Sequence, residues 1–441
     1  MDTDLRIQQF VTLFDSDPRA SLAGVSALVA ELTEAAGPSD PETLFARERL
    51  VYLMGRTDVP LDSVSAGRAL VDDLTSFRGA DDFDTLYARY TLANNIEKAY
   101  SAHHAIDALS PLRADASSVL GPTAELTLLV SIKLADALRK SGQFTEALAE
   151  YQALVTPAEN LWGASHGLVV EIDLCRAICV YEVEGPRAAA AVNLARLRKV
   201  DDASRSLPIV MDLQERLARF LDASGQHAEA VEVYRDIHGR ILADHGTDAP
   251  ETLTALSDVG YSLWRNGEMD EAVRILTQVV ASEECSRGPD ADETTTSRGY
   301  LAAALLQADL YSQAKGEYAT LVSVSTERAG YASEKTLEYR DGLVDANLGL
   351  GELQEALQYL VPLIEDSALV LGRNSPQTLG RRFKLAACLG QSGETRKAAD
   401  AFESLARDAS PVLGANNEFV TQARMRAQYW SQRVSFRDFR A

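Results

Sequence analysis

Residues 246–288 read GTDAPETLTALSDVGYSLWRNGEMDEAVRILTQVVASEECSRG, and a glycine returns after every 21 residues of this stretch. Helix-favouring residues fill both intervals. Glycine often follows the last turn of a helix, because it adopts positive φ without strain. Each interval therefore predicts one helix, and the whole stretch predicts a helical hairpin that turns at Gly267.

The same 21-residue spacing runs through most of the chain, with a one-residue slip between Gly163 and Gly225. Fourteen of the 18 positions in this register hold glycine, whereas 27 glycines placed at random among 441 residues would fill about one. The glycines in register are Gly37, Gly79, Gly121, Gly142, Gly163, Gly225, Gly246, Gly267, Gly288, Gly330, Gly351, Gly372, Gly393 and Gly414. The other four positions hold Ser16, Asp58, Tyr100 and Asp309. Two helices per repeat make a unit of 42 residues, so the sequence predicts a tandem helical repeat.

The segments that follow alternate register positions are of two kinds. One kind reads PSDPETL from Pro38, TDAPETL from Thr247 and RNSPQTL from Arg373, which predicts a helix start with an Asp, Ser or Asn cap and an early proline. The other kind has alanine five residues after the register position, at Ala105, Ala147, Ala190, Ala230, Ala272, Ala314, Ala356 and Ala398. A large residue follows four positions later, at Tyr151, Leu194, Tyr234, Leu276, Tyr318, Leu360 and Phe402. Small and large residues at helical spacing allow two helices to pack closely.

These motifs resemble the tetratricopeptide repeat (TPR) family, in which a glycine-bearing first helix pairs with an Ala-x3-aromatic second helix. The best match is Leu256-x2-Val259-Gly260-x2-Leu263, followed by Gly267 and Ala272-x3-Leu276. The 42-residue period and the Pro-Glu-Thr-Leu opening are similar to the long repeats of kinesin light chains and their bacterial relatives. The resemblance covers roughly residues 16–414 and implies a repeat fold without catalytic residues.

We therefore expect an all-α chain, a right-handed α-solenoid (superhelix) of about ten TPR-like helix hairpins with a C-terminal capping helix. Residues 1–36 are predicted to form a degenerate N-terminal capping hairpin, and residues 37–414 the tandem 42-residue repeats. An irregular joint is expected near residues 185–206, where Gly185 is one residue late and no glycine follows. Residues 415–441 are expected to form the capping helix and a basic tail.

Composition and net charge limit the kinds of partner that are expected. The chain is 46% hydrophobic and 24% charged, with a net charge of −22, so we expect no binding to nucleic acid or to anionic membranes, and we expect a basic or mixed partner. Only four cysteines occur, without a paired framework, and no apolar run is long enough to span a membrane. A cytoplasmic location is expected. Arginine outnumbers lysine 35 to 8, which suggests a GC-rich bacterial genome.

The candidate binding surface is the concave groove lined by the first helices. Residues three and six positions before each closing register position lie on one helical face, which points away from the partner helix. The predicted partner-binding residues are Asn94, Asp136, Arg139, Arg216, Arg219, Asp222, Tyr261, Trp264 and Arg265. Guanidinium groups beside aromatic rings are enriched in binding hot spots, and they suit a carboxylate and the apolar positions of an extended peptide. The alternative is that Tyr261 and Trp264 are ordinary packing residues between repeats and that the arginines are solvated.

Signatures of enzymes and metal sites are absent from the sequence. There is no phosphate-binding loop and no nucleophile elbow, so no catalytic or cofactor-binding residues are predicted. Cys175 and Cys179, with His166 nearby, form at most part of a zinc site, because a fourth ligand is lacking. Buried small residues are the favoured interpretation of the two cysteines, and no metal is expected.

The sequence thus predicts a non-enzymatic scaffold or adaptor that captures an extended segment or a helix of a partner protein. The alternative is a regulatory receptor that closes around a short signalling peptide and modulates a partner, and an enzyme is the third possibility.

The C-terminal segment from Arg424 to Arg440 is basic and aromatic. It is predicted to dock on the repeats rather than to bind RNA.

Overall fold

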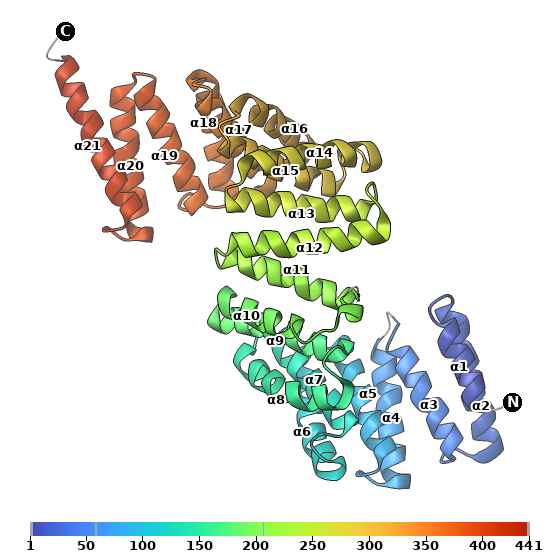
Figure 1. Cartoon of the computed structure of the whole chain (residues 1–441). Helices are drawn as coiled ribbons and strands as arrows, with labels where there is room; N and C mark the ends of the chain where they lie inside the picture. The colour runs from blue at the N-terminus through green and yellow to red at the C-terminus, as the bar shows by residue number, and fades with distance from the viewer. Residues whose placement is uncertain (1–2, 58–59, 206, 439–441) are drawn as a thin grey trace. The chain divides into compact units, whose positions relative to one another are not determined.

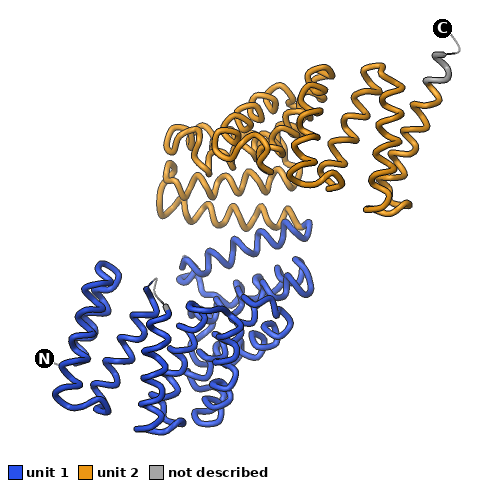
Figure 2. The backbone as a smooth tube through the Cα atoms, turned by 180° about the vertical axis from the view of Figure 1, so that it is seen from behind, with its two compact units in different colours: residues 1–225 blue, residues 226–441 orange. Residues whose placement is uncertain are grey.

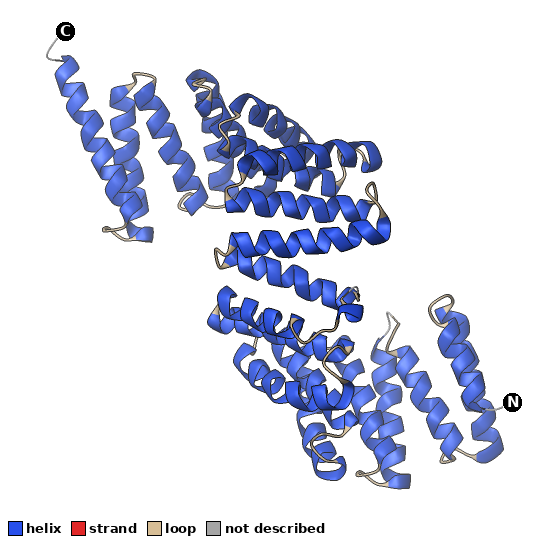
Figure 3. Ribbon diagram, viewed as in Figure 1, coloured by secondary structure: helices blue, strands red, loops and turns tan. Residues whose placement is uncertain are grey.

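A computed structural model describes residues 3–57, 60–205 and 207–438, and it describes no side chains at residue 60 or at residues 434–438. Within these residues the secondary structure is helical throughout, and Figure 3 shows helices joined by short loops without a strand in the described chain. The all-α solenoid prediction is confirmed. Asp58, Phe439 and Arg440, which the sequence analysis used, lie outside the described residues.

The chain forms two compact units, residues 1–225 and residues 226–441 (Figure 2). The helices of the first unit are α1 (Thr3–Leu13), α2 (Pro18–Ala36), α3 (Pro41–Met54), α4 (Pro60–Arg78), α5 (Phe83–Ala99), α6 (Ala102–Leu120), α7 (Glu125–Lys140), α8 (Phe144–Trp162), α9 (Gly167–Glu184), α10 (Pro186–Leu197), the 3-10 helix η1 (Asp202–Ser204) and α11 (Pro208–Ala223).

The second unit continues the alternation of helix and short turn, as the labels in Figure 1 show. Its helices are α12 (His227–His245), α13 (Pro250–Asn266), α14 (Met269–Arg287), α15 (Asp292–Gln307), α16 (Tyr311–Ala329), α17 (Glu334–Gly349), α18 (Leu353–Val370), α19 (Pro376–Gln391), α20 (Thr395–Leu413) and α21 (Glu418–Asp438). We call the odd-numbered helices up to α19 first helices and the even-numbered helices second helices, and α21 is the C-terminal helix.

Most second helices run up to the glycine that follows them. Helix α14, for example, continues to Arg287, directly before Gly288. The reason is that the glycine itself closes the last turn, because the Gly288 N–H donates to the Glu284 carbonyl at 3.2 Å. The helix therefore runs up to its glycine without an intervening loop.

The glycine that ends the first helix α13 has a left-handed conformation, whereas Gly185 after the first helix α9 combines φ 95° with ψ 177°. Gly267, after α13, has φ 86° and ψ 7°. The next residue, Glu268, donates its N–H to the Leu263 carbonyl at 3.0 Å, which is the six-residue hydrogen bond of a Schellman motif. The register position after α15 holds Asp309 with φ 59°, a conformation that aspartate tolerates.

The glycines that end second helices differ, and this corrects the expectation of a left-handed glycine at every register position. Gly288 combines φ 95° with ψ 159°, and Gly246 combines φ 85° with ψ 174°. Positive φ with extended ψ is accessible essentially only to glycine. Among the 18 register positions, all those after second helices hold glycine and all four vacancies fall after first helices. Only the irregular stretch has a second helix, α10, that ends without a glycine, with Arg198 as its C-cap.

In two repeats the threonine of the Pro-Glu-Thr-Leu segment, or of its counterpart Glu334 to Leu337, connects one helix to the turn before it. The Thr252 hydroxyl donates to the Gly246 carbonyl at 2.7 Å, and the Thr336 hydroxyl donates to the Gly330 carbonyl at 3.0 Å. The equivalent threonines are buried in every such segment, at Thr43, Thr85, Thr127, Thr252, Thr294, Thr336 and Thr378. At Thr252 and Thr336 this hydrogen bond holds the glycine turn against the first turn of the next helix. The described chain offers no hydrogen-bond partner to the buried hydroxyls of Thr43, Thr85, Thr127 and Thr294.

The predicted helix caps are only partly correct. Asp40 caps α3 by accepting the Glu42 N–H at 3.0 Å, and the Ser375 hydroxyl caps α19. Helices α13 and α15 instead begin after Ala249 and Ala291, which provide no side-chain cap. In these two repeats the aspartate lies one residue too early to cap the helix.

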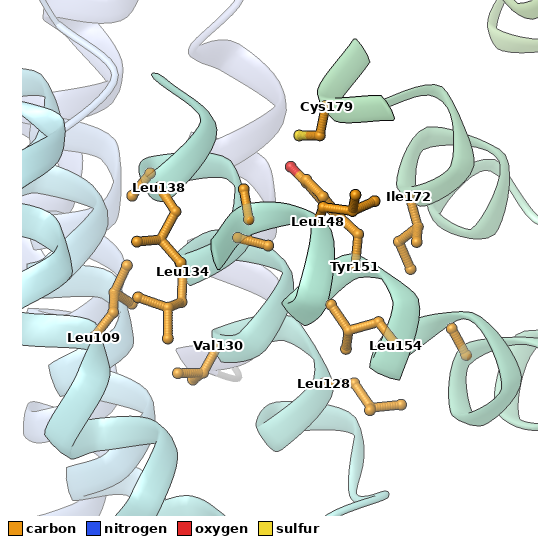
Figure 4. Packing of buried hydrophobic residues seen from close by; sticks show 14 of the residues in the cluster. Leu109, Leu128, Val130, Leu134, Leu138, Leu148, Tyr151, Leu154, Ile172 and Cys179 are labelled. Carbon is orange, nitrogen blue, oxygen red and sulfur yellow. The ribbon is translucent and has the colours of Figure 1, made fainter. Parts of the chain in front are cut away.

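Burial confirms that the small and large residues predicted on the second helices pack in the core, with one exception. The eight alanines are all buried, and Tyr151, Leu276, Leu360 and Phe402 are at most 1% exposed. Figure 4 shows Tyr151 among Leu148, Leu154, Ile172 and other apolar side chains of the first unit. Leu194 is wrong as a core residue, because it is 41% exposed on α10, where its neighbours Asn193 and Arg196 are buried instead.

Helix α10 lies in the stretch that was expected to be irregular. It begins directly after Gly185 and has only 12 residues, where the other second helices have 18 or 19. The Arg196 side chain is 1% exposed, donates to Asp173 of α9 at 2.5 Å, and pairs with Glu159 of α8 at 2.7 Å. This buried ion network joins α8, α9 and α10 where the short helix leaves less apolar surface to bury.

Within each unit the first helices form one side of the stack. Consecutive first helices contact each other from α1 to α11 and from α13 to α17, more extensively than consecutive second helices do. The first helices are thus closer together and provide the inner side of each unit. A partner that lies along this side can touch several repeats at once.

Candidate binding surface of the first helices

The predicted binding residues lie on first helices in both units, and each unit is described separately. Asn94, Asp136, Arg139, Arg216, Arg219 and Asp222 belong to the first unit, on α5, α7 and α11. Tyr261, Trp264 and Arg265 belong to the second unit, on α13. The prediction that the α11 and α13 residues form one cluster joins two units and stays a prediction.

On α5 and α7 the structure brings charged residues into a connected network. Asp136 pairs with Arg139 at 2.6 Å and with Lys140 at 2.7 Å. Glu97 of α5 accepts from Lys140 at 2.8 Å and pairs with Lys133 at 3.1 Å. Asn94 lies half-buried one turn before Glu97 on the same helix. The network ties two repeats together and places several cations on an otherwise acidic chain.

The pKa values of these carboxyl groups show how well the cations compensate for burial. Burial alone raises the pKa of Asp136, but hydrogen bonds from Lys140 and Arg139 outweigh that effect and lower the pKa. The same balance, with Lys140 and Lys133 as partners, lowers the pKa of Glu97. Both carboxylates are therefore stably ionised, and the network is preformed.

On α11 the three predicted residues have different environments. Arg219 is exposed, Arg216 is half-buried and pairs with Asp212 at 3.3 Å, and Asp222 is buried. Glu215 directly precedes Arg216, and burial raises the pKa of its carboxyl group against the opposing effect of Arg219. Arg219 is thus the α11 residue that is most available to a partner.

On α13 the three predicted residues contact one another. The rings of Tyr261 and Trp264 are 5.8 Å apart in an edge arrangement, and the Arg265 guanidinium lies 5.9 Å from the Tyr261 ring centre. Arg265 also donates to the Tyr261 hydroxyl at 3.0 Å. The cluster holds two half-buried rings and an exposed guanidinium.

The sequence analysis missed two members of this cluster on α15. The Tyr300 ring lies 4.8 Å from the Tyr261 ring, and the Trp264 indole N–H donates to the Gln307 side chain at 2.8 Å. Both residues lie outside the positions three and six before the register position, and on α15 no other positions were considered, although Arg216 and Arg265 had been included at positions nine and two of their own helices. Positions nine and two before it lie on the same face and would have identified them. We call Tyr261, Trp264, Arg265, Tyr300 and Gln307 the α13–α15 cluster.

The sequence analysis also missed an ion network in the second unit. Lys384 of α19 pairs with Asp341 at 2.8 Å and with Asp345 at 2.7 Å, both on α17. Burial raises the pKa of Asp345, and Lys384 offsets only part of the effect. Like the α5–α7 network, this one spans two consecutive first helices.

The C-terminal helix explains the small residues near position 390. A β-carbon at Gly390 would meet the Trp430 ring at 2.3 Å, so this glycine admits the tryptophan of α21. Arg426 lies 5.6 Å from the Phe383 ring centre, and Arg433 lies 4.7 Å from that of Tyr429. Helix α21 therefore covers α19 and α20, and docking of the last residues of the tail stays a prediction.

The cysteines lie apart from any metal-binding arrangement in the described part of the chain. Cys179 is buried and Cys175 is half-buried, and burial raises the pKa of Cys179 to about 11 and raises the pKa of Cys175 as well. Among the described residues no three His, Cys, Asp or Glu side chains are placed to hold a metal ion. Across the same residues, none of the helices has the length and apolar character that crossing a bilayer requires.

Comparison with solved structures defines the class of fold. The chain is similar to the apo form of RapI, with a TM-score of 0.56 and 10% identity over 89% of this chain and 98% of that one. It is also similar to a signal transduction ATPase with a tetratricopeptide repeat sensor from Pyrococcus horikoshii, with a TM-score of 0.52 and 13% identity over 89% of this chain and 55% of that one. The TPR-like repeats of a putative kinesin light chain from Podosopora anserina give a TM-score of 0.42 and 23% identity over 45% of this chain and 94% of that one.

The fold is that of a helical-repeat protein, an α-solenoid of stacked hairpins. More particularly, the stacked hairpins are similar in fold to those of solved proteins with tetratricopeptide repeats. By sequence, neither a protein-family model nor a curated protein matches the chain.

Proposed function

We propose that this protein is a non-enzymatic scaffold or adaptor in the cytoplasm, which captures an extended segment or a helix of a protein partner along its first helices. The α13–α15 cluster is the observation that carries the proposal. It combines three aromatic rings and a guanidinium on the inner side of a repeat stack, and aromatic and arginine residues dominate the binding energy of protein interfaces. The free state of all four cysteines supports a reducing compartment.

The capture is steric and electrostatic. The half-buried rings of Tyr261 and Trp264 pack against apolar positions of the partner, and hydrogen bonds to Arg265 and Gln307 already fix their orientations. Little rotamer freedom is then lost on binding, so more of the contact energy contributes to affinity. In the first unit, the exposed Arg219 is available to a carboxylate of the same partner.

The test begins with affinity purification from the native host and mass spectrometry to identify the partner. Trp264→Ala combined with Arg219→Ala is then expected to weaken capture by about 2–4 kcal/mol, because hot-spot truncations have costs of this order. Isothermal titration calorimetry measures the affinity, and circular dichroism checks the helix content. Trp264→Phe serves as a second variant that keeps an aromatic ring but loses the hydrogen bond to Gln307.

The matched control removes an aromatic residue and an arginine from second helices. Tyr359 on α18 is 38% exposed, and the Arg274 side chain on α14 is 66% exposed. Tyr359→Ala combined with Arg274→Ala is expected to leave the affinity unchanged. Full binding by the Trp264 and Arg219 double variant would refute the proposed surface, and so would an equal loss in the control.

A further inference from the structure

A cavity of about 260 Å3 opens between the first helices α3 and α5, wholly within the first unit. This space is large enough to admit the end of one long side chain. Leu44 and Leu74 close its inner end, because both are at most 3% exposed. Phe45 and Phe83, which are 37% and 52% exposed, line its open end together with Tyr87.

The polar group of the cavity is the Glu48 carboxylate, which is incompletely compensated. The residue is 7% exposed, and its Oε1 accepts the Thr91 hydroxyl at 3.1 Å. Its Oε2 accepts no hydrogen bond, although the Arg49 Nε lies 3.1 Å away, because that N–H does not point at the oxygen. Burial raises the pKa of Glu48 in spite of the opposing effect of Arg49. A buried carboxylate of this kind gains from an additional donor.

The chain's own arginine shows which chemistry suits the cavity. The Arg49 guanidinium lies 5.1 Å from the Phe45 ring centre and 6.0 Å from the Tyr87 ring centre, within the range of cation–π attraction. Its side chain is about one-third exposed, so it can move towards solvent. Asp84, which already pairs with Arg78 outside the cavity lining, adds a second carboxylate to the lining, and the whole chain carries a net charge of −22. Apart from Arg49, the charges and rings of the cavity all attract a cation.

We propose that this cavity, the α3–α5 pocket, binds a basic side chain, a lysine or an arginine, of the protein partner. The aliphatic stem packs between the rings of Phe45 and Phe83, and the cationic end donates to Glu48 Oε2 while Arg49 swings outwards. This inference rests on the proposed scaffold function and specifies the chemistry of the partner. The site is separate from the α13–α15 cluster, which lies in the other unit.

The experiment uses the full chain and small probes. Nα-acetyl-lysine methylamide and Nα-acetyl-arginine methylamide are titrated by saturation-transfer NMR, with the uncharged norleucine analogue for comparison. The basic probes are expected to bind about tenfold more tightly than the norleucine probe, because only they pair with the carboxylate. Glu48→Gln is expected to remove this preference.

Substitution of Arg49 distinguishes a cationic ligand from an anionic one. Arg49→Met removes the competing cation, so it is expected to tighten binding of the basic probes several-fold, whereas an anionic or zwitterionic ligand would lose affinity. Phe83→Ala truncates an exposed ring and is expected to weaken both basic probes without affecting folding. The control is Glu34→Gln on α2, an exposed residue outside the pocket, which removes one negative charge and is expected to leave binding unchanged.

Three results would overturn the proposal: equal binding of the norleucine probe, unchanged binding by Glu48→Gln, or weaker binding by Arg49→Met. The probes report on the α3–α5 pocket alone. A negative result here therefore leaves the Trp264 and Arg219 experiment decisive for the scaffold function, and loss of capture in that experiment is independent of the pocket.

Discussion

Glycine has two distinct roles in this chain, and the two differ by backbone geometry at single residues. Gly267 has the left-handed conformation that asparagine and aspartate also adopt, whereas Gly288 has positive φ with extended ψ. The chain itself shows the distinction, because Asp309 replaces glycine at a first-helix end and no other residue type replaces it at a register position after a second helix. The allowed backbone region of each position, rather than the space around it, decides which residues can occupy it.

The two glycines are therefore expected to respond differently to the same substitution. Gly288→Asn should destabilise the fold by about 1–3 kcal/mol, because asparagine is strained in that region, whereas Gly267→Asn should change stability by less than about 1 kcal/mol. Neither position has an atom within 4 Å of an added β-carbon, so steric contact does not confound the comparison. Thermal unfolding followed by circular dichroism measures the difference, and equal destabilisation by the two variants would contradict the assignment.

At the scale of helices, a few buried charged groups determine how successive elements join. Arg196 fixes the short α10 against α8 and α9, and Glu283 lies buried at the end of α14. Glu283 is less well compensated, because its Oε2 accepts no hydrogen bond and its contact with Arg287 is 3.5 Å long. Burial raises the pKa of Glu283, with smaller opposing effects from Ser297 and Arg287.

This raised pKa predicts a pH-dependent effect of Glu283→Gln. A carboxyl group whose pKa is higher in the folded state stabilises the fold below its unfolded pKa and loses that contribution as the pH rises through the folded value. The wild-type chain thus carries a penalty at neutral pH that glutamine lacks. Glu283→Gln is expected to be more stable by on the order of 1 kcal/mol at neutral pH, with little difference near pH 4.

The difference in stability is measured from the melting temperatures of the wild type and Glu283→Gln between about pH 4 and pH 8. Glu327→Gln on α16 is the control, because Glu327 is exposed, and its substitution is expected to leave the pH profile unchanged. A Glu283→Gln variant that is less stable than the wild type at neutral pH would show that the carboxylate is well compensated after all.

The molecule as a whole consists of two compact units, whose boundary between Gly225 and Gln226 falls at a register glycine rather than in the irregular stretch 185–206. The contacts of the described chain are local, because helices contact mainly their neighbours in sequence. Each unit can therefore offer a surface on which different repeats carry different chemistry, such as the α3–α5 pocket in one unit and the α13–α15 cluster in the other.

A static adaptor and a peptide receptor differ in their response at this scale. We expect the radius of gyration to change by less than about 5% when the identified partner segment binds, because the contacts of the first helices are already formed in the free chain. Small-angle X-ray scattering with and without the segment measures the change. A clear contraction would favour the alternative receptor function instead.

The sequence alone determined the helices, their order and the turns between them, because helix ends are local events. The spacing of glycines, the alanine and large residues of the second helices and the Pro-Glu-Thr-Leu segments each depend on backbone preference within a few residues. The expected helices were found for this reason, and Leu194 failed because its burial depends on the length of α10. Local preference carries no information about that length.

Only the tertiary structure decided which side chains meet across repeats. Tyr300 lies 39 residues from Tyr261 in sequence, and Lys384 lies 39 residues from Asp345, so no local pattern pairs them. The Glu48 carboxylate is an ordinary helix residue in the sequence and becomes unusual only because α5 covers it. Burial, pairing and cavities arise from packing between elements, and they are what distinguishes one repeat surface from the next.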